Sequence, residues 1–164
     1  MIEAVIFDLD GTLINLPINY DELFKELSKI TKTQDLRPLA EKISELDTAT
    51  KKKVFQAWDK IERDAQKQVT MLEEGKVLYG KYSPKPRVLV TMQGKAFVRK
   101  LLASMELQFD LVYTRENSLN RIEQLGLAAQ DLHKPFEKIL FIGNTEDDRL
   151  AAKTVGCQYH EVKP

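Results

Sequence analysis

The sequence predicts an α/β protein in which a parallel sheet carries a small all-helical insertion. Short apolar runs alternate with helical patterns in residues 1–14 and 73–164, whereas residues 15–72 show helical patterns only. Strands that alternate with helices form parallel sheets with right-handed crossovers. The chain has 164 residues and no internal repeat, so we expect one core with one insertion.

The first strand is predicted at Ala4–Phe7, an apolar run that is followed by two acids, Asp8 and Asp10. Both faces of this run are apolar, which is typical of a buried strand in a parallel sheet. Side chains alternate along an extended chain, so Asp8 and Asp10 leave the strand on the same side. Two neighbouring carboxylates in poor solvent repel each other, which indicates a bound cation or a shared proton.

The helical insertion contains three amphipathic patterns, separated by polar breaks at residues 31–35 and 47–48. Apolar residues recur in each pattern at the spacing of one helix face, and the third helix is predicted to be the longest. The run Lys51–Lys53 fits a solvated helix face better than a basic binding patch. The patterns cover Tyr20–Ile30, Leu36–Leu46 and Val54–Val69.

The rest of the chain is predicted to supply four more strands, the last of them weak, and four helices. The third of these helices is expected to end at Gly126 and the fourth at Gly156, because glycine commonly follows a helix end. The strands are expected at Val88–Thr91, Phe109–Tyr113, Lys138–Gly143 and Gln158–Val162, and the helices at Glu73–Tyr82, Lys95–Met105, Asn117–Leu125 and Glu146–Val155.

Polar residues stand at the carboxyl ends of four predicted strands, where open α/β sheets bind their ligands. A carboxylate there can divide phosphate-ester hydrolysis into two steps through an aspartyl-phosphate. A second acid can protonate the leaving group and later activate water, and Mg²⁺ prefers the oxygen ligands of such a site. The strand-end residues are Asp8 with Asp10, Thr91, Thr114 with Arg115, and Asn144.

The composition narrows the classes of partner and compartment. Lys and Arg number 25, as do Asp and Glu, so no net charge draws the protein to nucleic acid or to an anionic membrane. No apolar stretch is long enough to span a membrane, and the N-terminus has no signal-peptide pattern. The single cysteine, Cys157, fits a reducing compartment, so we expect a cytoplasmic protein. His133 and His160 lack the cysteine partners of a zinc site.

The segment Asp8-Leu9-Asp10-Gly11-Thr12-Leu13 resembles the first motif of the haloacid-dehalogenase-like hydrolases, most of which are Mg²⁺-dependent phosphatases. The resemblance implies a Rossmann-like parallel core. It also implies that Asp8 is the nucleophile and Asp10 the acid/base, and that the Asp10 backbone carbonyl is a metal ligand. The alternative is that the two acids merely cap a turn after a strand.

Three further segments resemble the later motifs of this family. Thr91, followed by Met92, resembles the second motif and implies phosphate binding, although a threonine that caps a helix is the alternative. Arg121 stands where the family usually has a lysine that binds the phosphate, and Lys134 is the second candidate.

The fourth motif is represented by Gly143–Asp148, in which Asn144 replaces the usual first acid. The implied metal ligands are Asp8, Asp10, Asn144 and Asp148. The alternative is that the acids at 146–148 only favour the positive end of a helix. An amide oxygen at position 144 brings no charge to the metal, so either Mg²⁺ binds more weakly or Asp147 compensates for the missing charge.

The family resemblance also assigns the two parts of the chain. Residues 1–14 and 73–164 correspond to its α/β core, and residues 15–72 correspond to a helical cap inserted after the first motif. Such a cap excludes water and selects the substrate. The sequence does not reveal which substrate this is, nor the oligomeric state.

These observations together predict a Mg²⁺-dependent phosphatase that hydrolyses a small phosphorylated metabolite through an aspartyl-phosphate. A mutase would share the same residues. The alternative from another class is a catalytically weak or inactive protein of the same fold that binds a phosphorylated ligand or a protein partner, and Asn144 is its support. A helical interaction module around Trp58 is a third alternative.

Overall fold

The computed structural model describes residues 1–163 and contains a five-stranded, all-parallel sheet with the order β5-β4-β1-β6-β7. The chain builds outward from the central strand β1 to β4 and β5, and then crosses to β6 and β7 on the other side. The order therefore reverses between β1 and β6, which is where sheets of this kind bind ligands. The strands are β1 (Ala4–Phe7), β4 (Arg87–Val90), β5 (Leu111–Tyr113), β6 (Ile139–Gly143) and β7 (Gln158–Glu161).

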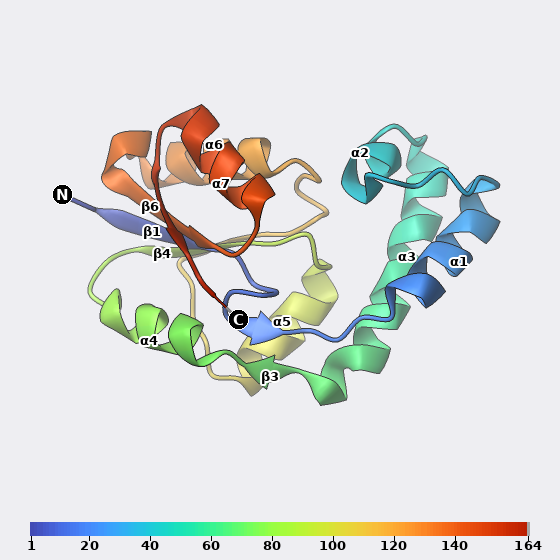
Figure 1. The fold of residues 1–164 in the computed structure, drawn as a ribbon, viewed down its shortest axis with the longest axis horizontal. Coiled ribbons are helices and arrows are strands. Elements are labelled where there is room, and N and C mark those ends of the chain that lie inside the picture. Colours follow the sequence, from blue (N-terminus) through green and yellow to red (C-terminus); the bar gives the residue numbers. More distant parts are fainter. Residues whose placement is uncertain (164) are drawn as a thin grey trace.

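Two helices cover each face of the sheet (Figure 1). The alternating side chains of β1 divide between two apolar clusters, since Val5 and Phe7 pack with the first pair of helices and Ala4 and Ile6 with the second. Both faces of β1 are buried, as its apolar run predicts. The first pair is α4 (Glu73–Lys81) and α5 (Lys95–Ser104), and the second pair is α6 (Arg121–Leu132) and α7 (Glu146–Val155).

Three helices between β1 and α4 form a separate group at the side of the sheet, which we call the helical block (residues 15–72; Figure 1). Two short antiparallel strands pair at its base, with Ile14 opposite Met71. Asn19 and Asp47 accept backbone N–H bonds at the starts of the first and third helices, which satisfies donors that a helix start leaves free. The elements are β2 (Ile14–Asn15), α1 (Tyr20–Thr31), α2 (Leu39–Ser44), α3 (Thr48–Ala65) and β3 (Thr70–Met71), with short 3₁₀ turns at Gln66–Gln68 and, in the core, Phe136–Lys138.

The predicted α/β class, the parallel sheet and the helical insertion are confirmed, and the third helix of the insertion is its longest. The prediction of a helix at Asn117–Leu125 that ends at Gly126 was wrong in both bounds. It starts at Arg121 and runs through Gly126 to Leu132. Glycine weakens a helix interior only modestly, and the apolar stripe of Leu125, Ala128 and Ala129 is buried against the sheet and carries the helix past it.

Among residues 1–163, no helix combines the length and the apolar character that a membrane crossing demands.

Candidate active site

The loop after β1 places Asp8 at the point where the strand order reverses. The Asp8 amide donates to the Ile142 carbonyl of β6 at 2.9 Å, so the sheet itself fixes the position of this residue. Its carboxylate is buried, and Oδ2 accepts a 3.3 Å hydrogen bond from the Thr12 hydroxyl. Gly11 follows with φ +82°, a conformation that residues with a side chain rarely adopt. A β-carbon at Gly11 would also collide with the Asn144 amide group.

Asp10 follows on the same loop, as expected, but its carboxylate is only partly buried. Its Oδ1 accepts the Leu16 backbone N–H at 2.9 Å. Leu16 lies just beyond β2, at the base of the helical block. The proposed acid/base therefore also joins the core to the block.

Arg121, the first residue of α6, places its guanidinium between two carboxylates. Nη2 lies 2.8 Å from Asp8 Oδ1 and Nε lies 3.1 Å from Asp148 Oδ1, while Nη1 donates to Gln124 Oε1 at 2.7 Å. Such charge-assisted bonds fix a guanidinium firmly.

Lys134 lies elsewhere. It pairs with Glu3 at 2.9 Å, and Glu3 precedes β1, at the opposite end of that strand from Asp8. Lys134, the second candidate for the phosphate-binding cation, therefore lies too far from Asp8 to fill that role.

Asp148 lies in the first turn of α7 and has two functions in the structure. Its Oδ2 accepts the N–H groups of Asn144 at 3.2 Å and Thr145 at 3.4 Å, and its own N–H donates to the Thr145 hydroxyl. This is a capping box, which stabilises the helix start. Since Oδ1 also contacts Arg121, Asp148 both caps the helix and belongs to the cluster of charged side chains around Asp8.

Asn144 directs one atom of its side-chain amide at three oxygens, and the identity of that atom decides what the cluster can bind. The Asp8 Oδ2, the Asp10 carbonyl oxygen and the Thr12 hydroxyl lie 3.0, 3.2 and 3.3 Å from that atom. If the atom is the amide oxygen, acceptors face each other around a point that suits an oxygen-ligated ion such as Mg²⁺. If the amide is turned over, its NH₂ group donates to the same oxygens.

The expected set of metal ligands is therefore unusual in its composition. Within residues 1–163, no three acidic, histidine or cysteine side chains converge as a metal site. The oxygens that a cation could meet here are instead those of the Asp8 carboxylate, the Asp10 carbonyl and, in one of its two orientations, the Asn144 amide. Asp148 lies behind them and contacts the backbone of Asn144.

Thr91 directly follows β4 and has a buried side chain. Its hydroxyl oxygen accepts the Gln93 N–H at 3.0 Å, and its carbonyl accepts Gln124 Nε2 at 2.9 Å. The residue that caps α5 is Gly94, so Thr91 is not the helix cap. A hydroxyl that accepts one bond still has its proton to donate, which leaves Thr91 able to bind an anion.

The surroundings of Asp8 favour its protonated form in the absence of a metal. Burial raises the pKa of Asp8 to about 7, and the Asp148 and Asp10 carboxylates add to this, whereas Arg121 opposes it. Burial also raises the pKa of Asp10. Raised pKa values of neighbouring acids are common at sites where protons are transferred.

The stability of the metal-free protein should therefore fall as the pH rises. Because the pKa of Asp8 is raised to about 7, its contribution to stability is complete below its unfolded value, near pH ~4, and is lost as the pH passes 7. In EDTA we expect the melting temperature to decrease from pH 5 to pH 8. Asp8→Asn, which stays neutral, should remove much of this slope; equal slopes in both proteins would contradict the assignment.

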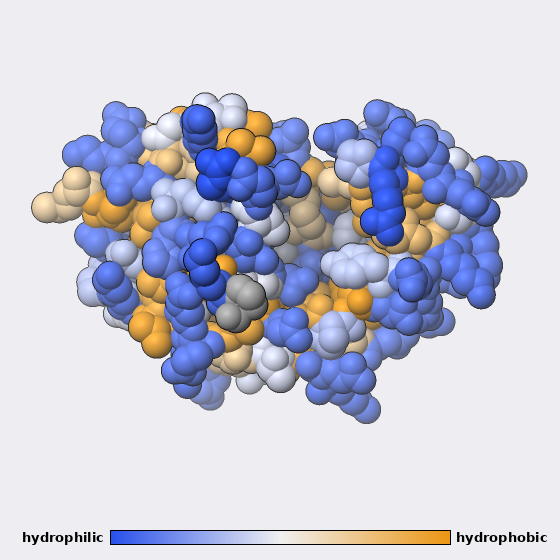
Figure 2. Space-filling view, viewed as in Figure 1, coloured by the Kyte–Doolittle hydropathy of each residue, from blue (hydrophilic) through white to orange (hydrophobic). Residues whose placement is uncertain are grey.

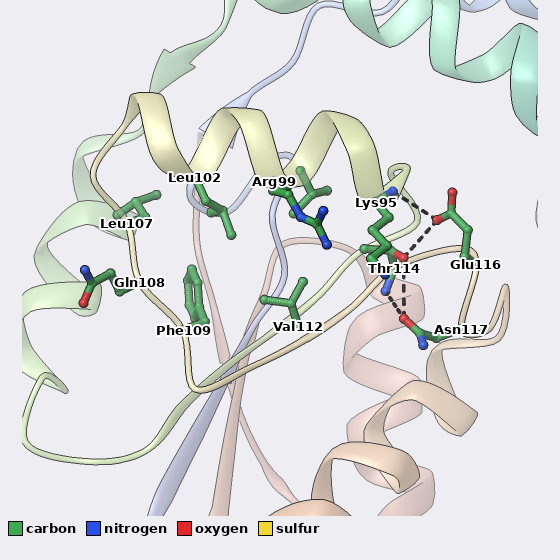
Figure 3. Close-up of a pocket in the computed structure, with 11 residues that line it drawn as sticks. Lys95, Arg99, Leu102, Leu107, Gln108, Phe109, Val112, Thr114, Glu116 and Asn117 are labelled. Atoms are coloured by element: carbon green, nitrogen blue, oxygen red, sulfur yellow. Dashed lines mark hydrogen bonds between the residues drawn. The ribbon is translucent and has the colours of Figure 1, made fainter.

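A hollow opens between the helical block and the core next to these residues. It has a volume of about 420 Å³ and is lined by Met92, Arg121 and Asp148 from the core and by Pro38 and Glu41 from the block. Figure 2 shows the notch between the two parts. A larger groove of about 630 Å³ runs along α5 and the edge strand β5 (Figure 3). Arg121 and Asp148, whose side chains contact one another and, through Arg121, Asp8, line the smaller hollow and not that groove, so we assign the site to the smaller hollow.

Sequence reasoning gave no role to Thr12 or Gln124, and it named Arg115 only as a strand-end residue. Thr12 lies within the first motif, but its contact with Asp8 depends on the turn at Gly11. Gln124 is buried and donates to three backbone carbonyls, including that of Thr91, and no sequence pattern marks such a contact. Trp58 is only 5% exposed, which weighs against the alternative of a helical interaction module around it.

Comparisons with solved structures identify the fold. No protein-family model and no curated protein sequence matches the chain. A haloacid dehalogenase-like family hydrolase from Streptococcus pneumoniae matches with a TM-score of 0.72 at 20% identity, over 99% of this chain and 85% of the other. CbbY from Rhodobacter sphaeroides, solved in complex with phosphate, matches with a TM-score of 0.69 at 17% identity, over 97% and 85%.

A predicted phosphoglycolate phosphatase from Haemophilus somnus is also similar, with a TM-score of 0.66 at 16% identity, over 96% of this chain and 84% of the other. These identities are too low to carry an activity across, but the similarity extends over nearly the whole chain. The chain therefore has the fold of the haloacid-dehalogenase-like hydrolases.

Proposed function

We propose that the protein is a Mg²⁺-dependent phosphatase that hydrolyses a small phosphomonoester through an aspartyl-phosphate on Asp8. The observation that carries the proposal is the buried Asp8 carboxylate, held 2.8 Å from the Arg121 guanidinium at the strand ends. Asp10 lies two residues further along the same loop. The fold agrees with the proposal, since its structural neighbours include hydrolases and a protein solved with phosphate.

In the first step, the Asp8 carboxylate attacks the phosphorus and the bond to the ester oxygen breaks. Asp10 gives its proton to the departing alkoxide, so that the product leaves as a neutral alcohol. In the second step, Asp10 takes a proton from a water molecule that attacks the phosphorus. Inorganic phosphate leaves and the Asp8 carboxylate is regenerated. The raised pKa of Asp10 suits the first of these tasks.

The phosphoryl group would be held from three sides by the chain itself. Arg121 supplies a cation beside the nucleophile, while the Thr91 hydroxyl and the N–H of Met92 lie at the end of the neighbouring strand β4. Preorganised donors of this kind lower the barrier because they meet the charge that develops at the phosphoryl oxygens. Mg²⁺, when bound, would neutralise the charge of the phosphate and of Asp8.

The helical block would act as a cap over this site, with residues 1–14 and 73–164 as the core. The hollow beside Arg121 has walls from both parts, including Pro38 and Glu41 of the block. A cap excludes water that would compete with the substrate and selects the leaving group. The volume of about 420 Å³ suits a small phosphorylated metabolite.

The balanced charge and the single Cys157 fit a cytoplasmic enzyme that binds neither nucleic acid nor a membrane. The test of the proposal is hydrolysis of a broad panel of phosphate esters with and without Mg²⁺. We expect activity only with Mg²⁺. Activity no higher than that of Asp8→Asn across the whole panel would favour the alternative of an inactive protein that binds a phosphorylated ligand or a partner.

That alternative has one specific observation in its favour. With its amide turned over, Asn144 donates to the Asp8 and Asp10 oxygens, so a side chain would satisfy the atoms that otherwise hold Mg²⁺. The same atoms thus have a stable arrangement without a metal, which an acid at position 144 would not provide.

Asn144→Asp should therefore tighten Mg²⁺ binding. A carboxylate at position 144, beside that of Asp8, adds charge to the site and removes the amide donors that compete with the ion, so we expect the Kd for Mg²⁺ to fall roughly tenfold or more. The melting temperature in EDTA should also fall, because acceptors then face each other unpaired. Calorimetric Mg²⁺ titration measures the first effect, and an unchanged Kd would show that Asn144 is not a ligand.

A further inference from the structure

A fully buried arginine joins the helical block to the loop that would bind phosphate. The Arg115 side chain follows β5 in the core and is completely buried. Its Nη1 lies 2.7 Å from Glu62 Oε2 and its Nη2 lies 3.0 Å from Glu62 Oε1, and Nη2 also pairs with Asp59. Glu62 is as buried as Arg115. The contact between the two parts is therefore an ion pair removed from water.

The side chains that contact the Arg115 guanidinium come from one face of α3. Trp58 places its ring 4.3 Å from the guanidinium carbon and Phe55 places its ring at 5.4 Å. Phe55, Trp58, Asp59 and Glu62 follow the spacing of neighbours along one side of a helix. This face of the block is therefore built around a single residue of the core.

The same ion pair holds the loop Thr91–Gly94 at two points. Both Glu62 oxygens lie 3.2 Å from the Gly94 N–H, and Arg115 Nη1 donates to the Met92 carbonyl at 3.3 Å. The absence of a side chain at Gly94 makes this approach possible. A β-carbon there would lie 2.7 Å from Arg115 Nη2 and 3.0 Å from Glu62 Oε1.

The loop Thr91–Gly94 thus has two neighbours. On one side it provides Thr91 and Met92 to the proposed phosphate site, and on the other it docks against α3. Two charges that separate into water regain their hydration, whereas one that stays buried without its partner does not. Docking of the block should accordingly be an all-or-none event, and it should also fix the conformation of the loop Thr91–Gly94.

We propose that Glu62 is a positioning residue that couples docking of the helical block to phosphate binding at the Thr91–Gly94 loop. The phosphate part rests on the function proposed above. Phosphate that binds the ordered loop favours the docked block, and by reciprocity the docked block favours phosphate. Glu62 touches neither the phosphate nor the nucleophile in this account, and acts only through Arg115 and Gly94.

The chain offers a matched control in Glu116. Its Oε1 accepts the Lys95 N–H at 3.0 Å and the Thr114 hydroxyl at 2.9 Å (Figure 3). Glu62 and Glu116 therefore both place a carboxylate at the start of α5. Only Glu62 belongs to the helical block, so Glu62→Gln and Glu116→Gln separate docking from capping of the helix.

Trp58 is the only tryptophan of the chain and lies on the ion pair, so its fluorescence reports docking directly. We expect Glu62→Gln to raise the acrylamide quenching constant of Trp58 and to weaken binding of inorganic phosphate, measured with Mg²⁺ by calorimetry, about tenfold. Glu116→Gln should change neither by more than about twofold. Gly94→Ala, which keeps every charge but obstructs the approach of α3, should behave as Glu62→Gln does.

Each outcome decides between the two proposals. Wild-type phosphate affinity in a folded Glu62→Gln or Gly94→Ala protein overturns the coupling and leaves the phosphatase proposal standing. If the wild type binds no phosphate, the phosphatase proposal fails, and hydrogen exchange at the amides of residues 91–93 then decides the positioning role. Faster exchange in Glu62→Gln but not in Glu116→Gln supports it, and equal exchange overturns it.

Discussion

Asp8→Asn is expected to abolish Mg²⁺-dependent hydrolysis of an aryl phosphate. The amide has nearly the shape of the carboxylate but is no nucleophile, so an aspartyl-phosphate cannot form. Removing the attacking group of a covalent mechanism typically lowers kcat by about 10⁴–10⁶. The fold should persist, because the Asp8 N–H that pairs with Ile142 is unchanged. Steady-state release of the aryl alcohol measures the loss.

Asp10→Asn provides the comparison for that variant. An aryl leaving group needs little protonation, so the intact Asp8 should still be phosphorylated, whereas activation of water in the second step is lost. We expect a burst of roughly one aryl alcohol per enzyme followed by slow turnover. A burst in Asp8→Asn, or turnover similar to the wild type, would remove Asp8 from the role of nucleophile.

Arg121→Ala is expected to lower kcat/KM by about 10²–10³, the effect of losing one preorganised donor to transition-state charge. Two further contacts with Asp8 and Asp148 would be lost with the side chain. Because Arg121 opposes the rise in the pKa of Asp8, the acid limb of the pH–rate profile should also move to higher pH.

Two further variants, Arg121→Lys and Lys134→Ala, serve as controls for Arg121→Ala. A lysine at position 121 keeps the charge that the family resemblance leads us to expect there, so it should restore part of the activity. Lys134 pairs with Glu3 at the far end of β1, so its removal should leave kcat/KM unchanged. Equal losses in Arg121→Ala and Lys134→Ala would mean that neither residue binds the phosphate.

The sequence was sufficient for the architecture because its apolar patterns are strong and local. The run Ala4–Phe7 is apolar on both faces, which predicts a buried strand of a parallel sheet, and the structure has it buried at the centre of the sheet. The end of α6 could not be predicted in the same way. Gly126 resembles a stop signal, but burial of Leu125 and Ala128 outweighs the modest cost of glycine inside a helix.

Some residues of the site could be predicted from the sequence and others could not. Asp8, Asp10, Thr91 and Asn144 stand at strand ends, so a parallel sheet was enough to bring them to one edge. The choice between Arg121 and Lys134 depended on where one helix begins, and sequence patterns locate helix ends poorly.

The pair Arg115 and Glu62 is separated by 53 residues and belongs to different parts of the chain. In the sequence Arg115 is marked only as a strand-end residue and Glu62 is one of many charged residues, and only the packing of α3 against the core shows that they pair. Contacts of this kind carry no local pattern, which is why the coupling between the block and the phosphate loop could be inferred only from the structure.

Exchange of oxygen between inorganic phosphate and water tests the central claim most directly, because it needs no knowledge of the substrate. Phosphate that reacts with Asp8 loses one oxygen as water, and hydrolysis of the aspartyl-phosphate returns an oxygen from the solvent. With Mg²⁺, the wild type should progressively replace the label of ¹⁸O-phosphate, and Asp8→Asn should not. No exchange by the wild type at saturating phosphate, or equal exchange by Asp8→Asn, would contradict phosphoryl transfer to this carboxylate.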